Sequence, residues 1–429
     1  MKKIILWSIV SLVIAGIAGD VFLWLRKPQV IKLNDGTKLT LVGVTYGKHH
    51  VAPKIKIAGA RARGGGARMD STNDTLVVWI EAEHKANQYP NYQLLVYDKA
   101  NTACVSTYAR AQSQIKNGVE IQGFMLDAYP RWDRKMVLRV MNYGQRGQQV
   151  SKEQFVVSNP ARSSFAKWTP DPLSNSQSDG DLDVTLTKLI AAAPSPYNRG
   201  NGVPKNDPMN KCVQIAFDVR QKGQSVTNWH PVRAETSDAV GNHVTGWINQ
   251  SGVRNGQSLG CFYQPGLWPD EPAWRLRLEF SRTSGFNDDE LWSVTNISVR
   301  AGSQQEIQNA WSWGNQVNPG RVPAAFAETT LNGIHVKLFP AIQYTDYGNN
   351  KVVGFVLKAD PDPETDGMRM SPLSVTDNQG RALNNQGSSW GGGNYQYEFG
   401  APRNIQSLNV TIALHRSRFF EFTVKPAKQ

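Results

Sequence analysis

The stretch that decides the fold is Trp274-Arg275-Leu276-Arg277-Leu278-Glu279-Phe280. Successive side chains of a strand point to opposite faces, so its four apolar residues share one face and its three charged residues share the other. An apolar sheet face is stable only when a second layer covers it. This stretch therefore predicts a strand of an antiparallel β-sandwich, and we expect an all-β protein.

The same order of segments recurs three times along the 429 residues. Met136–Val140 and Leu408–Leu414 are the counterparts of the first stretch. Each unit also holds a turn of the form Asp-x-x-Asn or Asp-x-x-Gly, headed by Asp98, Asp238 or Asp377. In such a turn the Asp side chain should accept a hydrogen bond from the backbone N–H two residues later, and the Asn or Gly should take a positive φ.

Each unit is expected to close with one further strand. These closing strands are predicted at Phe155–Val157, Val294–Val299 and Phe420–Val424. With about five to seven short strands per unit, the pattern predicts three tandem antiparallel β-sandwich domains.

The units resemble bacterial immunoglobulin-like domains over most of residues 30–426. Two further segments, Leu33–Gly47 and Trp168–Leu173, resemble a group of uncharacterised exported bacterial proteins. The first of these segments follows closely on an apolar N-terminal stretch. The resemblance implies an exported, membrane-anchored protein with immunoglobulin-like repeats, and it implies no catalytic residues.

The apolar N-terminal stretch runs over 22 residues, from Ile4 to Leu25, and its polar members are two serines and Asp20. As a helix it would be about 33 Å long, enough for a hydrocarbon core of about 30 Å. We expect a retained signal anchor that spans the cell membrane once, with the bulk of the chain in the periplasm or on the cell surface. A cleaved signal peptide ending near Ala18 or Gly19 is the alternative.

Segments rich in Pro, Ser, Asn, Gln and Gly separate the three units and are predicted to be linkers. We therefore expect sandwiches that follow one another along the chain. The predicted organisation is a signal anchor or signal peptide at 1–27, a sandwich at 28–165, a linker at 166–182, a sandwich at 183–300, a linker at 301–325 and a sandwich at 326–429.

The net charge of +12 is mostly scattered through the chain. One dense basic block lies in a Gly- and Ala-rich segment between Lys48 and Arg68, with no Phe, Trp or Tyr among its arginines. Binders of single-stranded nucleic acid stack bases on such aromatic side chains, so we expect no nucleic-acid partner. The expected partners are the membrane, through the N-terminal helix, and a protein or an envelope polymer. The oligomeric state stays open.

Of the three cysteines, Cys212 and Cys261 fall in the same unit. Both lie on segments with strand-like patterns, so one disulfide between them is one interpretation. Two buried free thiols are the other, and the sequence does not choose between them.

Motifs that assemble common catalytic centres are absent from the sequence. Its seven histidines form no HxxxH or HExxH pair, and neither a GxSxG elbow nor a Walker loop occurs. Glu81 and Glu83 share one face of a predicted strand and are the candidate acid/base pair of a glycan hydrolase. We favour a solvent-facing strand edge for these two residues, and we expect the protein not to be an enzyme.

Two sets of residues are candidates for binding. Spaced carboxylates before Gly367 are typical of a calcium loop, although two prolines among them depart from the EF-hand pattern and a plain acidic loop is the default. These candidate calcium ligands are Asp360, Asp362, Glu364 and Asp366, and no other cofactor is expected. The candidate aromatic ligand-binding residues, which lie near Gly or Asn in polar segments, are Trp311, Trp313 and Trp390.

Together these features predict a non-catalytic, membrane-anchored, extracytoplasmic interaction or scaffold protein. The first alternative is an array of carbohydrate-binding modules at the cell envelope, which would use the loop aromatic residues. The second alternative is a glycan hydrolase that uses Glu81 and Glu83.

Overall fold

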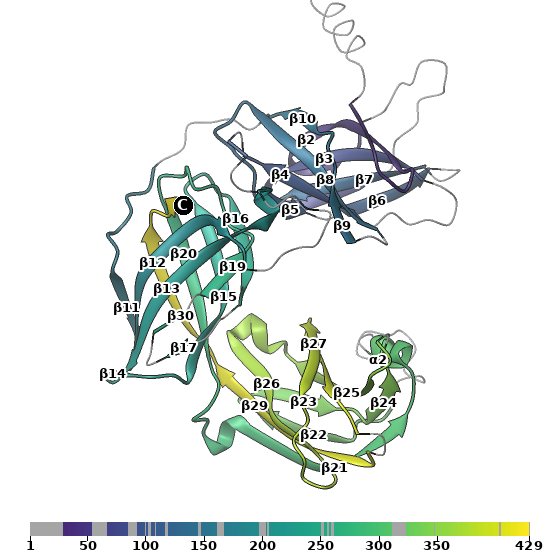
Figure 1. Ribbon diagram of the computed structural model, residues 1–429, viewed down its shortest axis with the longest axis vertical. Helices are drawn as coiled ribbons and strands as arrows, with labels where there is room; N and C mark the ends of the chain where they lie inside the picture. The colour runs from purple at the N-terminus through teal and green to yellow at the C-terminus, as the bar shows by residue number, and fades with distance from the viewer. Residues whose placement is uncertain are drawn as a thin grey trace, which may run out of the picture.

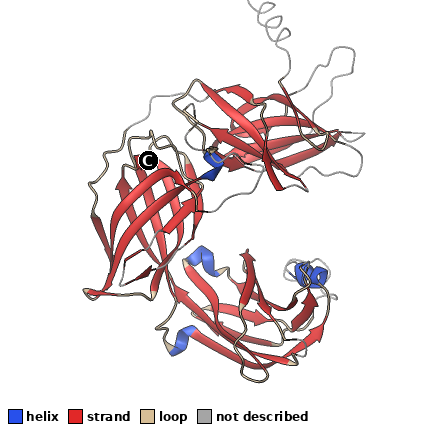
Figure 2. Ribbon diagram, in the orientation of Figure 1, coloured by secondary structure: helices blue, strands red, loops and turns tan. Residues whose placement is uncertain are grey.

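Strands make up nearly all of the regular structure in the part of the chain that is described (Figure 2). The computed structural model describes residues 29–53, 67–84, 92–98, 100–101, 104–107, 109–115, 119–144, 147–160, 167–196, 203, 206–249, 253–254, 257–258, 261–310, 323–346, 348–402 and 405–428. The all-β prediction is confirmed. Among these residues no helix is long and apolar enough to cross a membrane, and the predicted anchor at 1–27 lies outside them.

Two sheets form the N-terminal sandwich, the name used below for β1 to β10. One sheet has the order β1 (Val30–Lys32), β2 (Lys38–Val51), β3 (Arg68–Glu83), β7 (Val119–Leu126) and β6 (Ala109–Ile115). The other has the order β10 (Phe155–Ser158), β8 (Lys135–Gly144), β4 (Tyr92–Tyr97) and β5 (Cys104–Thr107), and β9 (Gly147–Val150) pairs with β8. Val78 and Ile80 of the first sheet share a buried cluster with Leu94 and Leu138 of the second, so each sheet covers the apolar face of the other.

The central sheet is one hydrogen-bonded sheet, and its buried apolar residues are continuous with those of the N-terminal sandwich. Its order is β11 (Asn175–Asp179), β12 (Leu182–Pro194), β13 (Lys211–Gln221), β19 (Cys261–Gln264), β16 (His243–Asn249), β15 (Trp229–Asp238), β20 (Trp274–Arg282) and β30 (Arg418–Val424). Shorter elements join its margins: β14 (Gln224–Ser225), β17 (Val253–Arg254), β18 (Gln257–Ser258), β31 (Ala427–Lys428) and the 3-10 turn η1 (Pro208–Asn210). The two outer strands meet, because Arg418 of β30 lies 3.0 Å from Asp179 of β11.

The C-terminal sheet contains the remaining strands. Its order is β22 (Ala327–Leu331), β23 (Ile334–Leu338), β25 (Lys351–Asp360), β24 (Ala341–Thr345), β21 (Leu291–Ala301), β29 (Ser407–Arg416) and β26 (Met368–Asp377). The hairpin β27 (Asn385–Gly391) and β28 (Asn394–Gly400) joins β25, and the short helices are α2 (Gln304–Ala310), η2 (Asp288–Glu290) and η4 (Pro363–Asp366). Phe355, Leu408 and Ile412 are in its buried core.

The chain crosses from the C-terminal sheet into the central sheet at one residue, Ser417. β29 ends at Arg416 and β30 begins at Arg418. A hairpin needs a loop of about two residues or more, so β30 has no room to fold back beside β29. It continues into the central sheet and pairs antiparallel with β20 (Figure 1).

The pairing of the closing strands therefore differs from the sequence prediction. The strand predicted at Val294–Val299 belongs to β21 and pairs with β29, whereas the strand predicted at Phe420–Val424 belongs to β30 and pairs with β20. The predicted ranges 183–300, 301–325 and 326–429 do not coincide with the hydrogen-bonded sheets. The repeat shows the order of strands but not their partners, and the predicted strands left five residues for a hairpin where the structure leaves one.

The turns headed by Asp238 and Asp377 form as predicted. In the turn at Asp238, the N–H of Val240 donates to the Asp side chain at 3.1 Å, and Gly241 takes a φ of 86°. In the turn at Asp377, the N–H of Gln379 donates to the Asp side chain at 2.8 Å. The short polar side chain replaces a backbone acceptor, which is why Asp heads these turns.

Cys212 and Cys261 are both buried and unbonded, so the disulfide interpretation is wrong. Cys261 is the register partner of Ile215, three positions from Cys212, and an odd offset places the two side chains on opposite faces of the sheet. Burial raises the pKa of Cys212 to about 11 and that of Cys261 to about 12. Both thiols therefore stay protonated at neutral pH.

The crossing predicts that a C-terminal substitution destabilises the central sheet. Phe422 is fully buried there, opposite Leu276, and Phe422→Ala should lower the free energy of unfolding by about 3–5 kcal/mol. Hydrogen exchange should rise in β20 and stay unchanged in β25. The exposed neighbour Glu421 supplies a control, since Glu421→Gln should change stability by less than about 1 kcal/mol. Faster exchange in β25 with an unaffected β20 would contradict the crossing.

Candidate functional site

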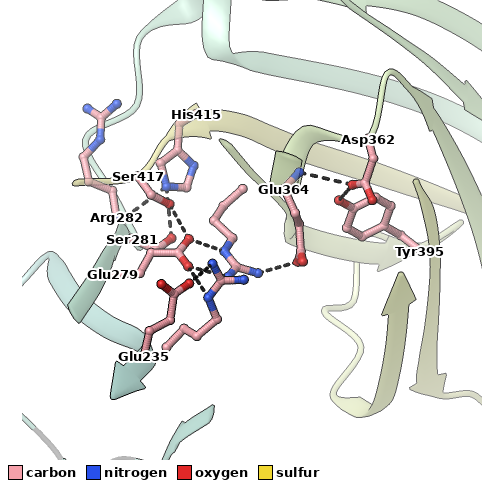
Figure 3. A network of polar contacts seen from close by, with 11 residues as sticks. Glu235, Glu279, Ser281, Arg282, Asp362, Glu364, Tyr395, His415 and Ser417 are labelled. Atoms are coloured by element: carbon pink, nitrogen blue, oxygen red, sulfur yellow. Dashed lines mark hydrogen bonds and ion pairs between the residues drawn. The ribbon is translucent and has the colours of Figure 1, made fainter. Parts of the chain in front are cut away.

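A buried carboxylate lies where the chain crosses between the two sheets. Glu279 of β20 is 4% exposed and accepts hydrogen bonds from Arg369 at 2.6 and 2.7 Å and from the Ser417 hydroxyl at 2.8 Å (Figure 3). Arg233 of β15 lies 3.3 Å away on the other side. Burial opposes the charge of Glu279, but the hydrogen bonds and charge of Arg369 outweigh burial and hold the pKa of Glu279 below its ordinary value.

The alternation of buried and exposed residues in Trp274–Phe280 is thus interrupted at one position, Glu279. Arg275 faces solvent and Arg277 is half-buried, as expected for the charged face, whereas Glu279 is buried. Its cover comes from Arg369 on β26 and from the crossing residue Ser417. A pattern within one strand contains no information on side chains that reach it from a different sheet.

Two further carboxylates extend this cluster. Glu235 accepts hydrogen bonds from Arg233 at 2.6 Å and from Arg277 at 3.1 Å. Glu364 pairs with Arg369, the residue that also binds Glu279. Each carboxylate is therefore engaged by at least one arginine, and the cluster is suited to holding two sheets together rather than to transferring protons.

A neutral histidine lies next to the crossing. His415 is fully buried, and its Nε2 accepts a hydrogen bond from the backbone N–H of Arg282 at 3.1 Å and lies 3.0 Å from the Ser281 hydroxyl. Burial, together with the charges of Arg282 and Arg369, lowers the pKa of His415 to about 4. The imidazole therefore acts as a fixed acceptor between β20 and β29 at neutral pH.

Two exposed tryptophans form what we call the aromatic corner. Trp247 of β16 and Trp390 of β27 are 44% and 37% exposed, and their rings lie 5.1 Å apart at 86°. The guanidinium of Arg369 lies over the Trp247 ring at 5.1 Å, so the buried cluster also supports the corner. The two rings come from different sheets, and their meeting depends on the crossing.

The neighbours of the aromatic corner are polar, and two of them are charged. Thr245 and Asn249 are exposed on the Trp247 side of β16, at strand spacing of two. Gln386 and Ser388 are exposed on β27, four and two residues before Trp390. Arg369 lies over the Trp247 ring, and Arg233 of β15 is the cross-strand partner of Trp247. The corner therefore offers apolar ring surface beside hydroxyl, amide and guanidinium groups.

One of the three predicted aromatic ligand-binding residues is among the described residues. Trp390 lies in the corner, whereas Trp311 and Trp313 lie outside the described residues. Sequence reasoning did not select Trp247 as a site residue. The available signal was its place on a strand face otherwise made of His243, Thr245 and Asn249, where a large aromatic side chain is unusual.

The predicted calcium ligands lie around η4. Asp362 accepts a hydrogen bond from the Glu364 N–H at 3.1 Å, and Glu364 is bound to Arg369. Asp360 and Asp366 are exposed at the two ends of this segment. Among the described residues, no group of three or more His, Cys, Asp and Glu side chains is arranged to hold a metal ion.

The two members of the candidate acid/base pair differ in burial. Glu81 is 2% exposed, while Glu83 is half-buried and pairs with Lys38 at 3.3 Å. The expected solvent-facing edge is therefore wrong for Glu81. Its face of β3 is covered by a second apolar cluster around Val77 and Trp79.

Comparison with known proteins adds no family. No protein-family model matches this chain, and no curated protein sequence matches it.

Glu279→Gln tests the buried cluster. It leaves Arg369 and Arg233 without their shared charge, and we expect a loss of about 3–5 kcal/mol in the free energy of unfolding. The matched control is Glu306→Gln, which breaks the exposed pair with Arg300 and should cost less than about 1 kcal/mol. Equal losses in chemical denaturation for the two variants would show that burial of Glu279 contributes nothing.

His415 predicts a pH dependence of stability. Its folded pKa of about 4 lies below the model-peptide value of 6.5, so between these values the unfolded chain binds more protons. The contribution is complete above about pH 6.5 and is lost as pH falls towards 4, on the order of 3 kcal/mol. His415→Gln keeps an acceptor that does not titrate, and the difference between the two stability curves should therefore change across this window. A constant difference would contradict the assignment.

Proposed function

We propose that this chain is a non-catalytic, membrane-anchored, extracytoplasmic interaction protein that binds its partner at the aromatic corner. The observation that carries the proposal is the exposed pair Trp247 and Trp390, held at a fixed angle by two different sheets. Trp and Arg dominate the binding energy of many interfaces, and Arg369 supports the pair from behind.

The chemistry of the remaining polar groups supports a binding role. The carboxylates Glu235, Glu279 and Glu364 are engaged by arginine. The thiols of Cys212 and Cys261 are held in their unreactive protonated form.

The proposed architecture is three immunoglobulin-like β-sandwich domains behind a single N-terminal membrane anchor at 1–27. The sequence repeat and the apolar stretch from Ile4 to Leu25 support it. Strand exchange at Ser417 modifies this plan, because it makes the third domain an insertion between β20 and β30 of the second. An anchor of this kind would present the aromatic corner in the periplasm or at the cell surface.

A second candidate function is carbohydrate binding at the envelope. The hydroxyl and amide groups of Thr245, Asn249, Gln386 and Ser388 favour it, because sugars combine apolar C–H faces with many hydroxyl groups. A protein partner would instead contact a wider area around the two rings, about 800 Å² on each side.

Photo-crosslinking tests the proposal and separates the two candidates. The full-length protein, with p-benzoyl-phenylalanine in place of Trp390, is irradiated in intact cells, and the same reagent replaces Tyr46, 41% exposed on β2, as the control. We expect an adduct from position 390 that exceeds the control by about tenfold. Tryptic peptides of a second protein in the adduct indicate a protein partner, and an added mass that glycosidase removes indicates a carbohydrate.

Alanine substitution supplies the energetic test. Trp247→Ala and Trp390→Ala should each weaken association with the captured partner by about tenfold or more, or about 1.4 kcal/mol, while Tyr46→Ala leaves it unchanged. Wild-type affinity in both tryptophan variants, or equal adducts at positions 390 and 46, would overturn the proposal.

A further inference from the structure

The N-terminal sandwich meets the central sheet at a joint where buried apolar residues of both bodies belong to one cluster and polar contacts add to them. The Asn242 side-chain carbonyl accepts hydrogen bonds from the Tyr129 N–H at 3.0 Å and from Arg131 at 3.1 Å. Arg131 also donates to the Gly241 carbonyl at 3.3 Å. These contacts dock the segment between β7 and β8 onto the turn between β15 and β16.

The turn between β15 and β16 contains a buried carboxylate, Asp238, that accepts several hydrogen bonds from N–H groups. Asp238 is 2% exposed and accepts hydrogen bonds from the N–H groups of Val240 and Asn242 and from the Asn242 side-chain amide. Burial raises the pKa of Asp238, while these three N–H donors favour the ionised carboxylate and oppose that shift. Arg131, across the joint, places a positive charge near the same carboxylate.

A second buried carboxyl group, that of Glu271, lies at the same joint and accepts fewer hydrogen bonds than Asp238 does. Glu271 is 4% exposed, and Trp132 of the N-terminal sandwich donates its indole N–H to it at 3.0 Å. The charged groups that act on Glu271 are the acids Asp238 and Asp270. Burial, then the charge of Asp238, raises the pKa of Glu271 to about 7.

The joint also contains a half-open pocket of about 320 Å³ between the two bodies. Thr107, Leu126 and Asp127 line it from the N-terminal sandwich, and Val244 and Pro265 line it from the central sheet. Asp127 is itself paired with Arg110 at 2.6 Å, and its carbonyl accepts the His243 N–H at 3.4 Å.

We propose that this joint is a proton-dependent latch, tight while the Glu271 carboxyl carries its proton and weakened when that proton leaves. This inference is independent of the proposed binding function. An ionised Glu271 would be a second negative charge buried beside Asp238, with one N–H donor from across the joint. Separation of Trp132 from Glu271 lets water reach the carboxylate and relieves that cost.

The sign of the response follows from the two states of the joint. A hydrated Glu271 in the open joint loses its proton near the ordinary value of 4.5, and the docked one near 7. The docked joint therefore binds the extra proton between these values. Its added stability is complete below about pH 4.5 and is lost as pH rises through about 7.

Hydrogen exchange on the full-length protein tests the latch. The amides to follow are those of Tyr129 and His243, whose acceptors lie across the joint, with the amides of β25 as the internal reference. After correction for intrinsic exchange, their protection should fall by about tenfold or more between about pH 5.5 and pH 8.5. Glu271→Gln, which cannot ionise, should keep the high protection at both pH values.

Two further variants make the test specific. Trp132→Phe removes the donor that favours ionised Glu271, so the midpoint of the transition should move to higher pH. Asp270→Asn removes an exposed neighbouring charge, so the transition should persist with a slightly lower midpoint. If Glu271→Gln fails to fold, the infrared band of a protonated carboxyl group in the wild-type protein, lost over the same pH range, supports the latch. Equal wild-type protection at both pH values, or a transition that persists in Glu271→Gln, would overturn it.

Discussion

The single-residue connection at Ser417 is the constraint on which the rest of the described structure depends. Because β29 and β30 have no room for a turn, one nearly continuous course of chain contributes a strand first to the C-terminal sheet and then to the central sheet. Earlier in the chain, β20 and β21 lead out of the central sheet into the C-terminal sheet, and they pair with those same two strands. Two antiparallel chain segments, β20 with β21 and β29 with β30, therefore join these sheets. Rotation of one sheet against the other requires both segments to deform together.

The polar cluster around Glu279 follows from that constraint. Every partner of its carboxylate lies near the point where the two segments cross, and Arg369 connects it to both Glu364 and Trp247. A buried ion pair of this kind adds little net stability over apolar packing, but it penalises any arrangement that separates its members. The cluster thus specifies the relative position of two sheets. The same arrangement brings Trp247 and Trp390 together at the surface.

Sequence reasoning reached the features that depend on neighbours along the chain. The alternation in Trp274–Phe280 and the turns headed by Asp238 and Asp377 are local, and the structure has them. Pairing between strands is not local. The three closing strands have similar sequences, so each could pair with the edge strand of more than one sheet. For the same reason Trp390 could be singled out from its polar surroundings, whereas its contact with Trp247 and the burial of Glu279 required two sheets to be brought together.

The place of β30 in the central sheet also affects when that sheet is completed. A chain is synthesised from its N-terminus, so β20 and its neighbours leave the ribosome well before their last partner exists. The whole C-terminal sheet is made in the interval. Until then the hydrogen-bonding edge of β20 and the apolar residues destined to meet Phe420 and Phe422 stay exposed, a state that invites pairing with other chains.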